Sequence, residues 1–496
     1  MFYRRHIITL TNRSSMTADG RSCYVGGKWI APDGGPIEVE NPATESVVER
    51  LPSATPETVA RACEAAAEAQ TEWARRTAQE RGDLLLKIGD VIDENVDEIA
   101  PLLVEEQGKP VSTAQGEVAA TGDLARYVAG WDRRLEGDIV PSDRDRESIH
   151  IRRYPVGVVA GIVPWNYPIA VLMRKLLPPL VAGNAVVLKP SEATPLSACR
   201  LVELLDDALD IPDGLINLVV GGPSVGAALV DDRNVDMVSM TGSTAAGKEI
   251  MRSAADSLTD VSLELGGKAP AIVLPDADIE DAVEHILTAR ITNTGQVCTC
   301  AECVYVHESV AEEFIEQYTD AMAAVEVGAP GDDPEMGPQV SAAEREKTDS
   351  AVQSAVKSGA TVRYGGGRPE GSTFETGYWY EPTVLADVTQ EMDVIQNEVF
   401  GPVMPIVTVD SAKEAVAYAN ESRYGLSSYV YTNDYGTAMR IAEDLEYGET
   451  YINRTLGESW QGYHTGWKES GVGGEDGKYG VRSYTKQKTI YHNYDQ

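Results

Sequence analysis

Four short apolar runs, separated by helical stretches, follow one another in the first half of the chain and restrict what it can fold into. They span residues 156–163, 185–188, 215–220 and 237–240 and are rich in Val, Ile and Leu. Runs that are apolar throughout, rather than at every second position, are typical of parallel strands buried on both faces. Strand, helix, strand at this pacing predicts βαβ units, and therefore an α/β fold built on a parallel sheet.

Glycines follow the third and the fourth of these runs. Gly221, Gly222 and Gly226 come after the third, and Gly242 and Gly247 come after the fourth. In open α/β sheets, ligands bind at the carboxyl ends of the strands, where helix N-termini accommodate phosphate groups. The sequence therefore predicts a phosphate-bearing ligand at this edge of the sheet.

The rest of the chain also divides into segments, and 496 residues are too many for one ordinary core. Residues 24–29 favour a hairpin with glycines in the turn, and residues 56–128 have helical periodicity. A second α/β region is expected between residue 271 and about residue 451. Its predicted strands are 271–274, 304–306, 402–407 and 428–431, and the polar, tyrosine-containing tail from Gly477 onward is expected to form a peripheral arm or strand.

The charge balance limits the kinds of partner. The 42 Lys and Arg residues are outnumbered by 78 Asp and Glu residues, which leaves a net charge of −36. Such a surface repels phosphate backbones, so nucleic-acid binding is disfavoured. Together with the excess of arginine over lysine, the charge indicates a halophilic protein in which salt screens the self-repulsion. High solubility without halophily is the alternative interpretation.

Cysteine usage and the apolar runs favour a cytoplasmic protein without a membrane span. Six cysteines in a chain of this length do not form a disulfide framework, which favours a reducing compartment. The apolar stretch 169–188 is interrupted by Arg174, Lys175 and a pair of prolines, so it is not expected to cross a membrane. Residues 1–13 lack the apolar core of a signal peptide, and residues 1–16 are expected to be a disordered extension.

One candidate nucleophile stands in the segment Asn-Thr-Gly-Gln-Val-Cys-Thr-Cys, residues 293–300. Cys298 follows a glycine-containing turn, and a cysteine whose thiol is converted to thiolate there can attack a substrate. A buried structural cysteine is the alternative. A metal site made of Cys298, Cys300, Cys303 and His307 is a second alternative, but no second cysteine pair accompanies this spacing and no metal is expected.

Two further segments contain polar side chains at predicted strand ends. Glu264 precedes two glycines, where a carboxylate can reach into a cleft and act as a general base. Asn166 follows a buried strand and lies between Pro164 and Pro168, where a rigidly held amide can donate to a developing oxyanion. Either residue alone could equally be a solvated glutamate or a turn-forming asparagine.

Taken together, these segments resemble the aldehyde dehydrogenase family. The matching motifs are Pro-Trp-Asn at 164–166, Leu-Lys-Pro-Ser-Glu at 188–192, Met-Thr-Gly-Ser at 240–243, Glu-Leu-Gly-Gly-Lys at 264–268, Gly-Gln-Val-Cys at 295–298 and Glu-Val-Phe-Gly-Pro at 398–402. They occur in the family's order, and the resemblance runs from about Tyr24 to about Tyr491. Met240 stands where the family more often has phenylalanine, and both residues are apolar.

The resemblance implies a fold, a mechanism and roles for five residues. The implied fold has a Rossmann-type cofactor domain, an α/β catalytic domain and a small oligomerisation arm. Cys298 would add to the aldehyde, Asn166 would stabilise the oxyanion, and Glu264 would activate the water that hydrolyses the thioester. Lys175 and Glu475 match a proton-relay pair behind that glutamate. A hydrolytic base argues against a CoA-acylating enzyme, and the retained residues argue against a catalytically silent binding or structural relative.

The resemblance also implies a dinucleotide cofactor, NAD, with NADP as the alternative. Lys189 and Glu192 would hold the adenosine ribose, where a carboxylate disfavours a 2′-phosphate, although family members with glutamate here sometimes use both cofactors. The residues implied to bind the cofactor are Val163, Pro164, Trp165, Lys189, Ser191, Glu192, Gly222, Gly226, Gly242, Ser243, Leu265, Glu398 and Phe400.

Within the family, the segments 296–302, 448–454, 461–464 and 471–478 are most similar to lactaldehyde and glycolaldehyde dehydrogenases. The residues that this similarity places near the substrate are Arg174, Asn293, Glu458 and His464. A guanidinium favours a hydroxyl or a carboxylate on a small substrate. A dehydrogenase for succinate semialdehyde or 2,5-dioxopentanoate therefore stays open, and His464 could instead be a structural histidine near the entrance.

The expected organisation follows from the same resemblance. Residues 20–140 and 160–266 would form the NAD-binding domain, and residues 267–456 the catalytic domain. Residues 141–159 and 477–496 would be oligomerisation segments of a homo-oligomer, either a dimer or a tetramer. The expected partner is a small aldehyde substrate, with no nucleic acid and no membrane.

Overall fold

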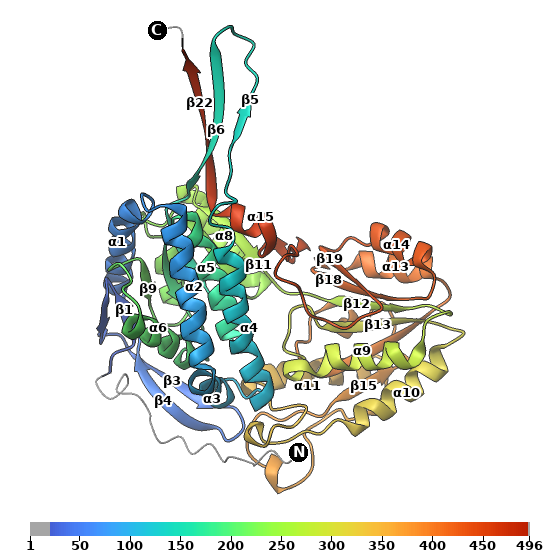
Figure 1. Ribbon diagram of the computed structural model, residues 1–496. Coiled ribbons are helices and arrows are strands. Elements are labelled where there is room, and N and C mark those ends of the chain that lie inside the picture. Colours follow the sequence, from blue (N-terminus) through green and yellow to red (C-terminus); the bar gives the residue numbers. More distant parts are fainter. Residues whose placement is uncertain (1–19, 495–496) are drawn as a thin grey trace, which may run out of the picture.

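The computed structural model describes residues 20–494, so the extension expected at residues 1–16 lies outside the described residues. Two lobes, each built on its own sheet, lie side by side, and a narrow arm projects from the first lobe (Figure 1). Chain segments before residue 267 supply most of the first lobe, and later segments supply the second. The α/β organisation predicted from the apolar runs is confirmed.

The first lobe contains an eight-stranded sheet in the order β2-β1-β9-β8-β7-β10-β11-β21 within residues 20–494. All four predicted strands are present, and so is the predicted hairpin, β1 and β2. The strands of this sheet are β1 (Cys23–Val25), β2 (Lys28–Ile30), β7 (Val158–Ile162), β8 (Ala185–Lys189), β9 (Ile216–Leu218), β10 (Met237–Thr241), β11 (Asp260–Glu264) and β21 (Gly471–Val472). The central strands from β9 to β11 run parallel, and β21 closes the edge in the antiparallel direction.

The parallel strands reverse their direction of progression between β7 and β10. From β7 the chain moves outward through β8 and β9, and it then returns to the other side of β7 as β10 and β11. The register pairs Ile162 with both Lys189 and Met240, and Thr241 with Glu264, so these strands end at one edge. Ligands of open α/β sheets bind at such a reversal point. The reversal therefore lies where the glycine-containing strand ends predicted a ligand.

Helices cover both faces of this sheet. The predicted helical region before residue 129 forms four helices, the first of which begins at Pro56 and is capped by the side chain of Thr55. The helices of the lobe are α1 (Pro56–Trp73), α2 (Ala78–Glu94), α3 (Val96–Glu106), α4 (Val111–Ala129), α5 (Pro168–Ala182), α6 (Leu196–Ala208), α7 (Pro223–Val230) and α8 (Thr244–Ser257). A short hairpin lies beside them, β3 (Pro36–Asn41) with β4 (Ser46–Pro52).

The second lobe contains a seven-stranded sheet in the order β14-β15-β16-β13-β12-β18-β19 within the described part of the chain. Its strands are β12 (Ala269–Val273), β13 (Ala301–His307), β14 (Thr361–Tyr364), β15 (Thr383–Ala386), β16 (Val403–Val409), β18 (Ser427–Tyr431) and β19 (Glu449–Ile452). Its helices are α9 (Ile279–Ile291), α10 (Ala311–Ala324), α11 (Ala342–Lys357), α12 (Asp393–Gln396), α13 (Ala412–Glu421) and α14 (Tyr435–Asp444). A small pair, β17 (Tyr424–Gly425) with β20 (Trp467–Lys468), lies outside this sheet.

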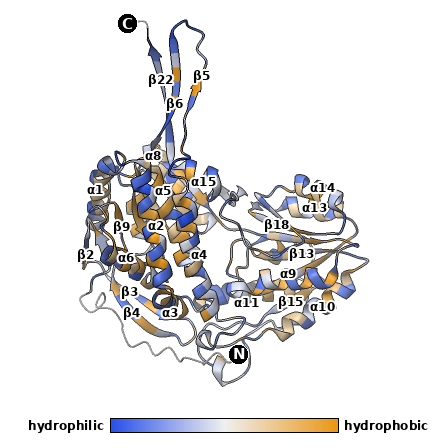
Figure 2. Cartoon of the chain, in the orientation of Figure 1, coloured by the Kyte–Doolittle hydropathy of each residue, from blue (hydrophilic) through white to orange (hydrophobic). Residues whose placement is uncertain are grey.

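The arm is a three-stranded antiparallel sheet of β5 (Asp138–Val140), β6 (Glu147–Pro155) and β22 (Thr485–Asn493). Helix α15 (Gly477–Ser483) lies on the body of the molecule and leads into β22 (Figure 1). The segments expected to be oligomerisation segments thus contribute two paired strands, and β5 joins them. Strands β6 and β22 are mostly hydrophilic in Figure 2.

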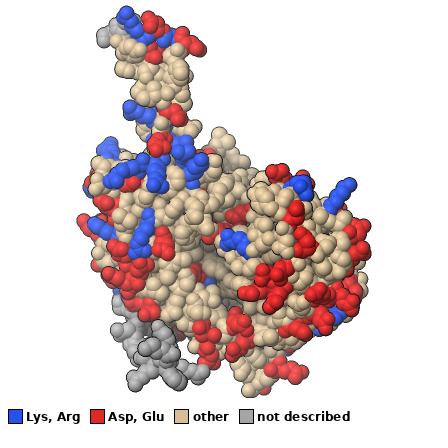
Figure 3. Space-filling view, turned by 45° about the vertical axis from the view of Figure 1, so that its right-hand side comes forward, with Lys and Arg blue, Asp and Glu red and all other residues tan. Residues whose placement is uncertain are grey.

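Most charged side chains lie on the surface of the molecule, and apolar side chains form its cores. Acidic side chains are spread over both lobes on the face shown in Figure 3, whereas basic side chains gather near the base of the arm. The cores consist mainly of Val, Ile, Leu and Ala from strands and the inner faces of helices. Among the described residues, no helix is both long and apolar enough to cross a membrane.

Candidate active site

A cleft with a volume of about 410 Å³ lies between the lobes at the carboxyl edge of the first sheet. The loop after β7 and the loop after β10 form one wall, and the segment before β13 forms the other. Thirteen of the predicted site residues line it together: Pro164, Trp165, Asn166, Arg174, Gly242, Ser243, Leu265, Cys298, Glu398, Phe400, Glu458, His464 and Glu475. Residues far apart in sequence, with predicted catalytic, cofactor and substrate roles, therefore share one cavity.

Cys298 differs from the other cysteines in its exposure. It is half-buried in the cleft wall, whereas the other five cysteines are buried. The turn before it contains Asn293 and Thr294 in the left-handed region, with φ of 50° and 61°. The absence of a side chain at Gly267 lets the backbone of Cys298 pack closely against it, since a Cβ at residue 267 would lie 2.6 Å from the carbonyl oxygen of Cys298. The local backbone thus presents one thiol to the cavity.

The alternative metal site at these cysteines does not form in the described chain. Cys300 and Cys303 are buried, and Cys300 directs its thiol to the carbonyl of Gly295 at 3.4 Å. Within residues 20–494, the one group of side chains close enough to share a metal ion does not include a cysteine.

Asn166 is tied to the nucleophile's loop by its amide. Its Nδ2 donates to the carbonyl oxygen of Gln296 at 2.9 Å, and its own carbonyl accepts from Lys109 and Asn293, both at 3.0 Å. One N–H of the amide is used in this bond, which leaves the second to donate toward the cleft that Asn166 lines. This geometry suits an oxyanion donor.

A buried acid on α4 holds the helix that follows Asn166. Glu117 accepts from the backbone N–H groups of Ile169 and Ala170 at 2.9 and 3.1 Å, in the first turn of α5. It also pairs with Lys109, whose ammonium lies 4.2 Å from the centre of the Tyr167 ring. A carboxylate is favoured at a helix N-terminus, where backbone N–H groups lack partners. Helix α4 therefore fixes the position of Asn166.

Glu264 ends strand β11 and carries a carboxyl group without hydrogen-bond partners among the described residues. It is 2% exposed, and its nearest cationic neighbour is Nε2 of His464 at 3.7 Å. Burial raises the pKa of this carboxyl to about 8, against the opposing effect of His464 and Lys175. An unpartnered carboxyl with a pKa near neutrality is matched to proton abstraction from water.

Behind Glu264, two basic residues of α5 pair with two consecutive acids. Lys175 forms a buried ion pair with Glu475, and Arg174 lies 2.7 Å from Asp476, although the Arg174–Asp476 pair is not aligned as a hydrogen bond. Burial would raise the pKa of Glu475, but Lys175 and Arg174 outweigh it and lower that pKa. Arg174 also stacks over the Trp460 ring at 5.2 Å and lines the cleft.

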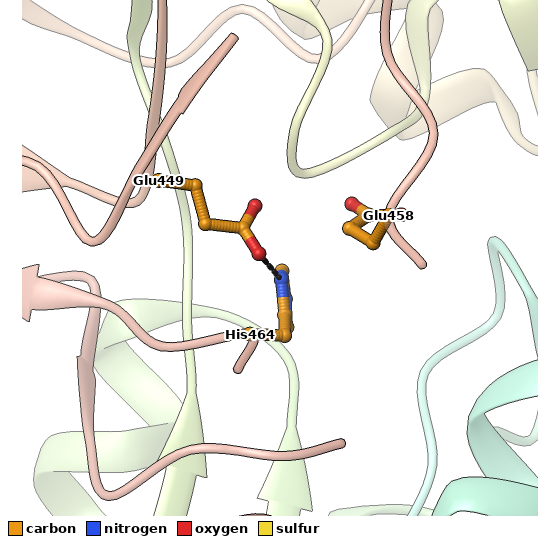
Figure 4. A group of neighbouring side chains, drawn as sticks. All are labelled: Glu449, Glu458 and His464. Atoms are coloured by element: carbon orange, nitrogen blue, oxygen red, sulfur yellow. Dashed lines mark hydrogen bonds and ion pairs between the residues drawn. The ribbon is translucent and has the colours of Figure 1, made fainter. Parts of the chain in front are cut away.

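His464 lies beside Glu449 and Glu458 (Figure 4), and its Nε2 lies 3.7 Å from Glu264. Its Nδ1 lies 3.2 Å from Glu449, Cys298 is its neighbour in the cleft, and its backbone pairs with Glu475. Burial opposes protonation of the imidazole, but the bonds to Cys298 and Glu449 raise its pKa well above the usual value. Ligand atoms of Glu449, Glu458 and His464 lie within 4.8 Å of one another.

The predicted cofactor residues fall into two groups. The first lines the cleft near Cys298: Trp165 and Phe400 pack edge to face at 5.4 Å, and Glu398 accepts from the backbone N–H of Gly267 at 2.9 Å. A Cβ on Gly266 would lie 2.8 Å from a Glu398 oxygen, so a larger residue at this position would displace the Glu398 carboxylate. Burial raises the pKa of Glu398 to about 7.

The second group lies outside this cleft, at the ends of β8 and β9. Lys189 pairs with Glu192 at 3.6 Å. Gly226 and Gly222 adjoin these two side chains, because a Cβ at Gly226 would lie 3.7 Å from Lys189 and a Cβ at Gly222 would lie 3.9 Å from Glu192. Ser191 accepts from the N–H of Ala193, and Val163 donates its N–H to Lys189. The two groups follow the same sheet edge, as an extended dinucleotide requires.

Two residues differ from what the sequence led us to expect: Asn293 lies away from the cleft, and Glu302 was not predicted. Asn293 is 3% exposed and does not line the cleft; its amide holds the carbonyl groups of Asn166 and Gln296. Glu302 was not singled out, yet it pairs with Lys268 and Arg290 and accepts from the N–H groups of Val399 and Phe400 at 3.1 Å. Its position two residues into a buried strand was the available signal.

The chain matches the family model described as the aldehyde dehydrogenase family over residues 29–490. It is 45% identical over 472 residues to lactaldehyde dehydrogenase of Escherichia coli (strain K12), which covers 94% of this chain and 98% of the relative. It is also 45% identical over 485 residues to 3,6-anhydro-alpha-L-galactose dehydrogenase of Streptomyces coelicolor, covering 97% and 98%.

Solved structures give the same result. Lactaldehyde dehydrogenase from Escherichia coli superimposes with a TM-score of 0.93, covering 95% of this chain and 99% of that chain at 45% identity. A 3,6-anhydro-L-galactose dehydrogenase in complex with NAP has a TM-score of 0.93 at 45% identity, covering 95% and 100%. Betaine aldehyde dehydrogenase from Staphylococcus aureus in complex with NAD+ has a TM-score of 0.94 at 34% identity, covering 97% and 98%.

Proposed function

The chain belongs to the aldehyde dehydrogenase family, and from this premise we propose that it oxidises a small hydroxylated aldehyde to the acid through Cys298. The membership confirms the expected fold class and the expected enzyme class, an NAD(P)-dependent oxidoreductase. The observation that carries the proposal is that Cys298 and Asn166 line one cleft together with His464, whose Nε2 lies 3.7 Å from the buried Glu264 carboxyl just behind the cleft wall.

We assign each step of the proposed reaction to a residue whose environment favours that step. The Cys298 thiolate adds to the aldehyde carbon, and the oxyanion forms beside the Asn166 amide and the backbone N–H of Cys298. Glu264 then takes a proton from the water that hydrolyses the thioester. The buried pair of Lys175 and Glu475 lies behind Glu264 and provides a path for that proton.

The residues present fit a dinucleotide. The cleft reaches the point where the strand order reverses, between β7 and β10, and Gly242 and Ser243 begin helix α8 there. Glu398 and Phe400 would hold the nicotinamide end, and Lys189 and Glu192 the adenosine ribose. When bound, NAD(P) supplies the hydride acceptor. The carboxylate of Glu192 supports NAD over NADP.

The charges around the polar end of the cleft support a hydroxyl rather than a carboxylate on the substrate. Arg174 is already paired with Asp476, and Glu458 lines the same wall. Glu449 also bonds His464 close by. A substrate carboxylate would therefore meet repulsion from several acids, whereas a hydroxyl can donate to Glu458 and accept from Arg174. The name of the lactaldehyde dehydrogenase relative supports the same substrate class.

A panel of aldehydes tests the proposal. We expect kcat/KM for lactaldehyde or glycolaldehyde to exceed that for succinate semialdehyde and 2,5-dioxopentanoate, with NAD and NADP compared in high salt. A preference for either semialdehyde would favour the alternative function instead. NADH formation without CoA is expected, and a requirement for CoA would exclude the hydrolytic mechanism.

The arm supports assembly into a homo-oligomer, as a dimer or a tetramer. It carries exposed apolar residues, with Ile139 76% and Tyr491 66% exposed. Strands with unpaired edges and exposed apolar side chains commonly pair with another chain. The oligomeric state, the cytoplasmic location and the halophilic origin stay predictions.

A further inference from the structure

We propose that His464, oriented by Glu449, accepts the proton of the Cys298 thiol and holds the resulting thiolate as an ion pair before substrate arrives. This inference adds a proton acceptor for the first step of the reaction. It rests on the proposed function only in taking Cys298 as the nucleophile. The step transfers one proton: the S–H bond breaks, an N–H bond forms on the imidazole, and the electron pair stays on sulfur.

One nitrogen of the imidazole is available to the thiol. Nδ1 lies 3.2 Å from Glu449, which leaves Nε2 as the nitrogen available to Cys298, the thiol beside His464 in the same cleft. A nucleophile, a base and a third group that orients the base are the arrangement by which thiols and hydroxyls are activated. The alignment of Glu449 with the ring is visible in Figure 4.

The His464 side chain is held in a fixed position by its backbone contacts and its burial. The backbone N–H of His464 donates to Glu475 at 3.0 Å, and the N–H of Glu475 returns to His464 at 2.7 Å. His464 is 3% exposed, so few rotamers are open to it. A base held in this way needs little reorganisation when it takes a proton.

The charge around the ring is mostly negative. The ionisable groups near it are Cys298 from the nucleophile's loop, Glu264 from β11, Glu449 from β19, the acids Glu458, Glu475 and Asp476, and the base Arg174. Acids outnumber bases there, which favours the protonated imidazole. Burial, with a smaller effect of Glu458, raises the pKa of the Cys298 thiol, and His464 is the largest influence that lowers it.

Glu264 is not equally suited to this first step. Its carboxyl makes no hydrogen bond with described residues, and its ion-pair neighbour is Nε2 of His464 at 3.7 Å. Assigning the thiol proton to His464 leaves Glu264 available for the later attack by water. Two proton acceptors then serve two separate steps.

The test is alkylation of Cys298 by iodoacetamide in the substrate-free enzyme, followed by peptide mass spectrometry from about pH 6 to about pH 10. No aldehyde is present, so a role of His464 in substrate binding cannot alter the result. His464→Gln is expected to slow labelling at neutral pH about tenfold or more and to move the midpoint of the profile upward. Glu449→Gln is expected to slow it less, about threefold, because the ring remains but loses its anionic partner.

Glu458→Gln is the matched control. It removes the same charge from the same cluster, but Glu458 raises the thiol pKa, so labelling is expected to stay equal or become faster. Wild-type labelling in both His464→Gln and Glu449→Gln would overturn the proposal, and so would equal slowing by Glu449→Gln and Glu458→Gln. Thermal unfolding identifies any variant that does not fold, and Glu449→Gln, which is isosteric, then carries the test.

The failure of this inference is distinguishable from the failure of the proposed function. If Cys298→Ala retains full turnover, Cys298 is not the nucleophile and the proposed function falls, whatever the labelling rates. If Cys298→Ala is inactive while labelling is independent of His464, the proposed function stands and the inference falls.

Discussion

Replacing Glu264 by glutamine separates the two halves of the proposed reaction. The carboxyl oxygens of Glu264 make no hydrogen bond with the described residues, so an isosteric amide breaks no such contact and the variant is expected to fold. General-base catalysis contributes roughly 10²–10⁴-fold to a rate, so steady-state turnover should fall by that factor, which corresponds to about 3–5 kcal/mol. The first turnover needs no base for water, so a burst of NADH should remain.

The direction in which wild-type turnover changes with pH tests the same role of Glu264. Burial raises the pKa of Glu264 to about 8, so the carboxyl is mostly protonated below that pH and only about a tenth is ionised at pH 7. A base acts in its ionised form. Steady-state turnover limited by hydrolysis should therefore rise as the pH rises through about 8, and Glu264→Gln should lose this rise.

Stopped-flow absorbance measures the burst, and mass spectrometry of the quenched enzyme measures the acyl group on Cys298. In Glu264→Gln we expect about one NADH per site and a persistent acyl adduct. Cys298→Ala is the control and should give neither burst nor adduct. Unchanged steady-state turnover in Glu264→Gln, or loss of the burst together with turnover, would refute the assignment of Glu264 as the hydrolytic base.

Three further outcomes are expected. Arg174→Leu should lower kcat/KM for lactaldehyde about tenfold or more and leave propionaldehyde nearly unaffected, because only the former offers a hydroxyl; an equal loss for both would contradict that role. Burial would raise the pKa of Glu302, but Lys268 and Arg290 lower it to about 2, so its contribution to stability is present above the unfolded pKa of about 4.5 and is lost as the pH falls toward 2. Glu302→Gln should therefore lower the free energy of unfolding in urea at pH 7 by about 3 kcal/mol, with a smaller difference at low pH. With a net charge of −36, the protein should lose activity and circular dichroism in dilute buffer and keep both in molar salt; full stability in dilute buffer would remove the halophile inference.

The sequence predicted the parallel strands of the first lobe well because their burial leaves a local signal. For short apolar runs such as 185–188, the length, the β-branched valines and the flanking Gly183 and Pro190 favour a strand over a buried helix. The lysine that closes this run lies at the strand's end as expected, and Glu264 likewise ends its strand. The partner of β11 was not predictable, because a two-residue strand such as Gly471–Val472 carries no periodicity.

Site residues that belong to a multi-residue sequence motif could be predicted. Single buried residues that support the site from a distant part of the sequence could not. Glu117 supports the Asn166 loop from far back in the chain, since it lies 52 and 53 residues before its bonded partners Ile169 and Ala170. Its signal is an acid on the buried face of a helix, beside Ala114 and Val118, but such a residue does not reveal its partner. Asn293 shows the converse, since the resemblance placed it near the substrate while its amide holds backbone carbonyls.

Strands synthesised late complete the lobe that is synthesised first. Between the end of β11 and its neighbour β21, roughly 200 residues must leave the ribosome, and Glu475 reaches Lys175 only after that. Until then the first sheet keeps an open edge, which invites pairing with other nascent chains. The second lobe meets no such delay, because its own strands lie between residues 269 and 452. A released chain that is truncated just before residue 470 should therefore be aggregation-prone, with only its later half protected from proteolysis.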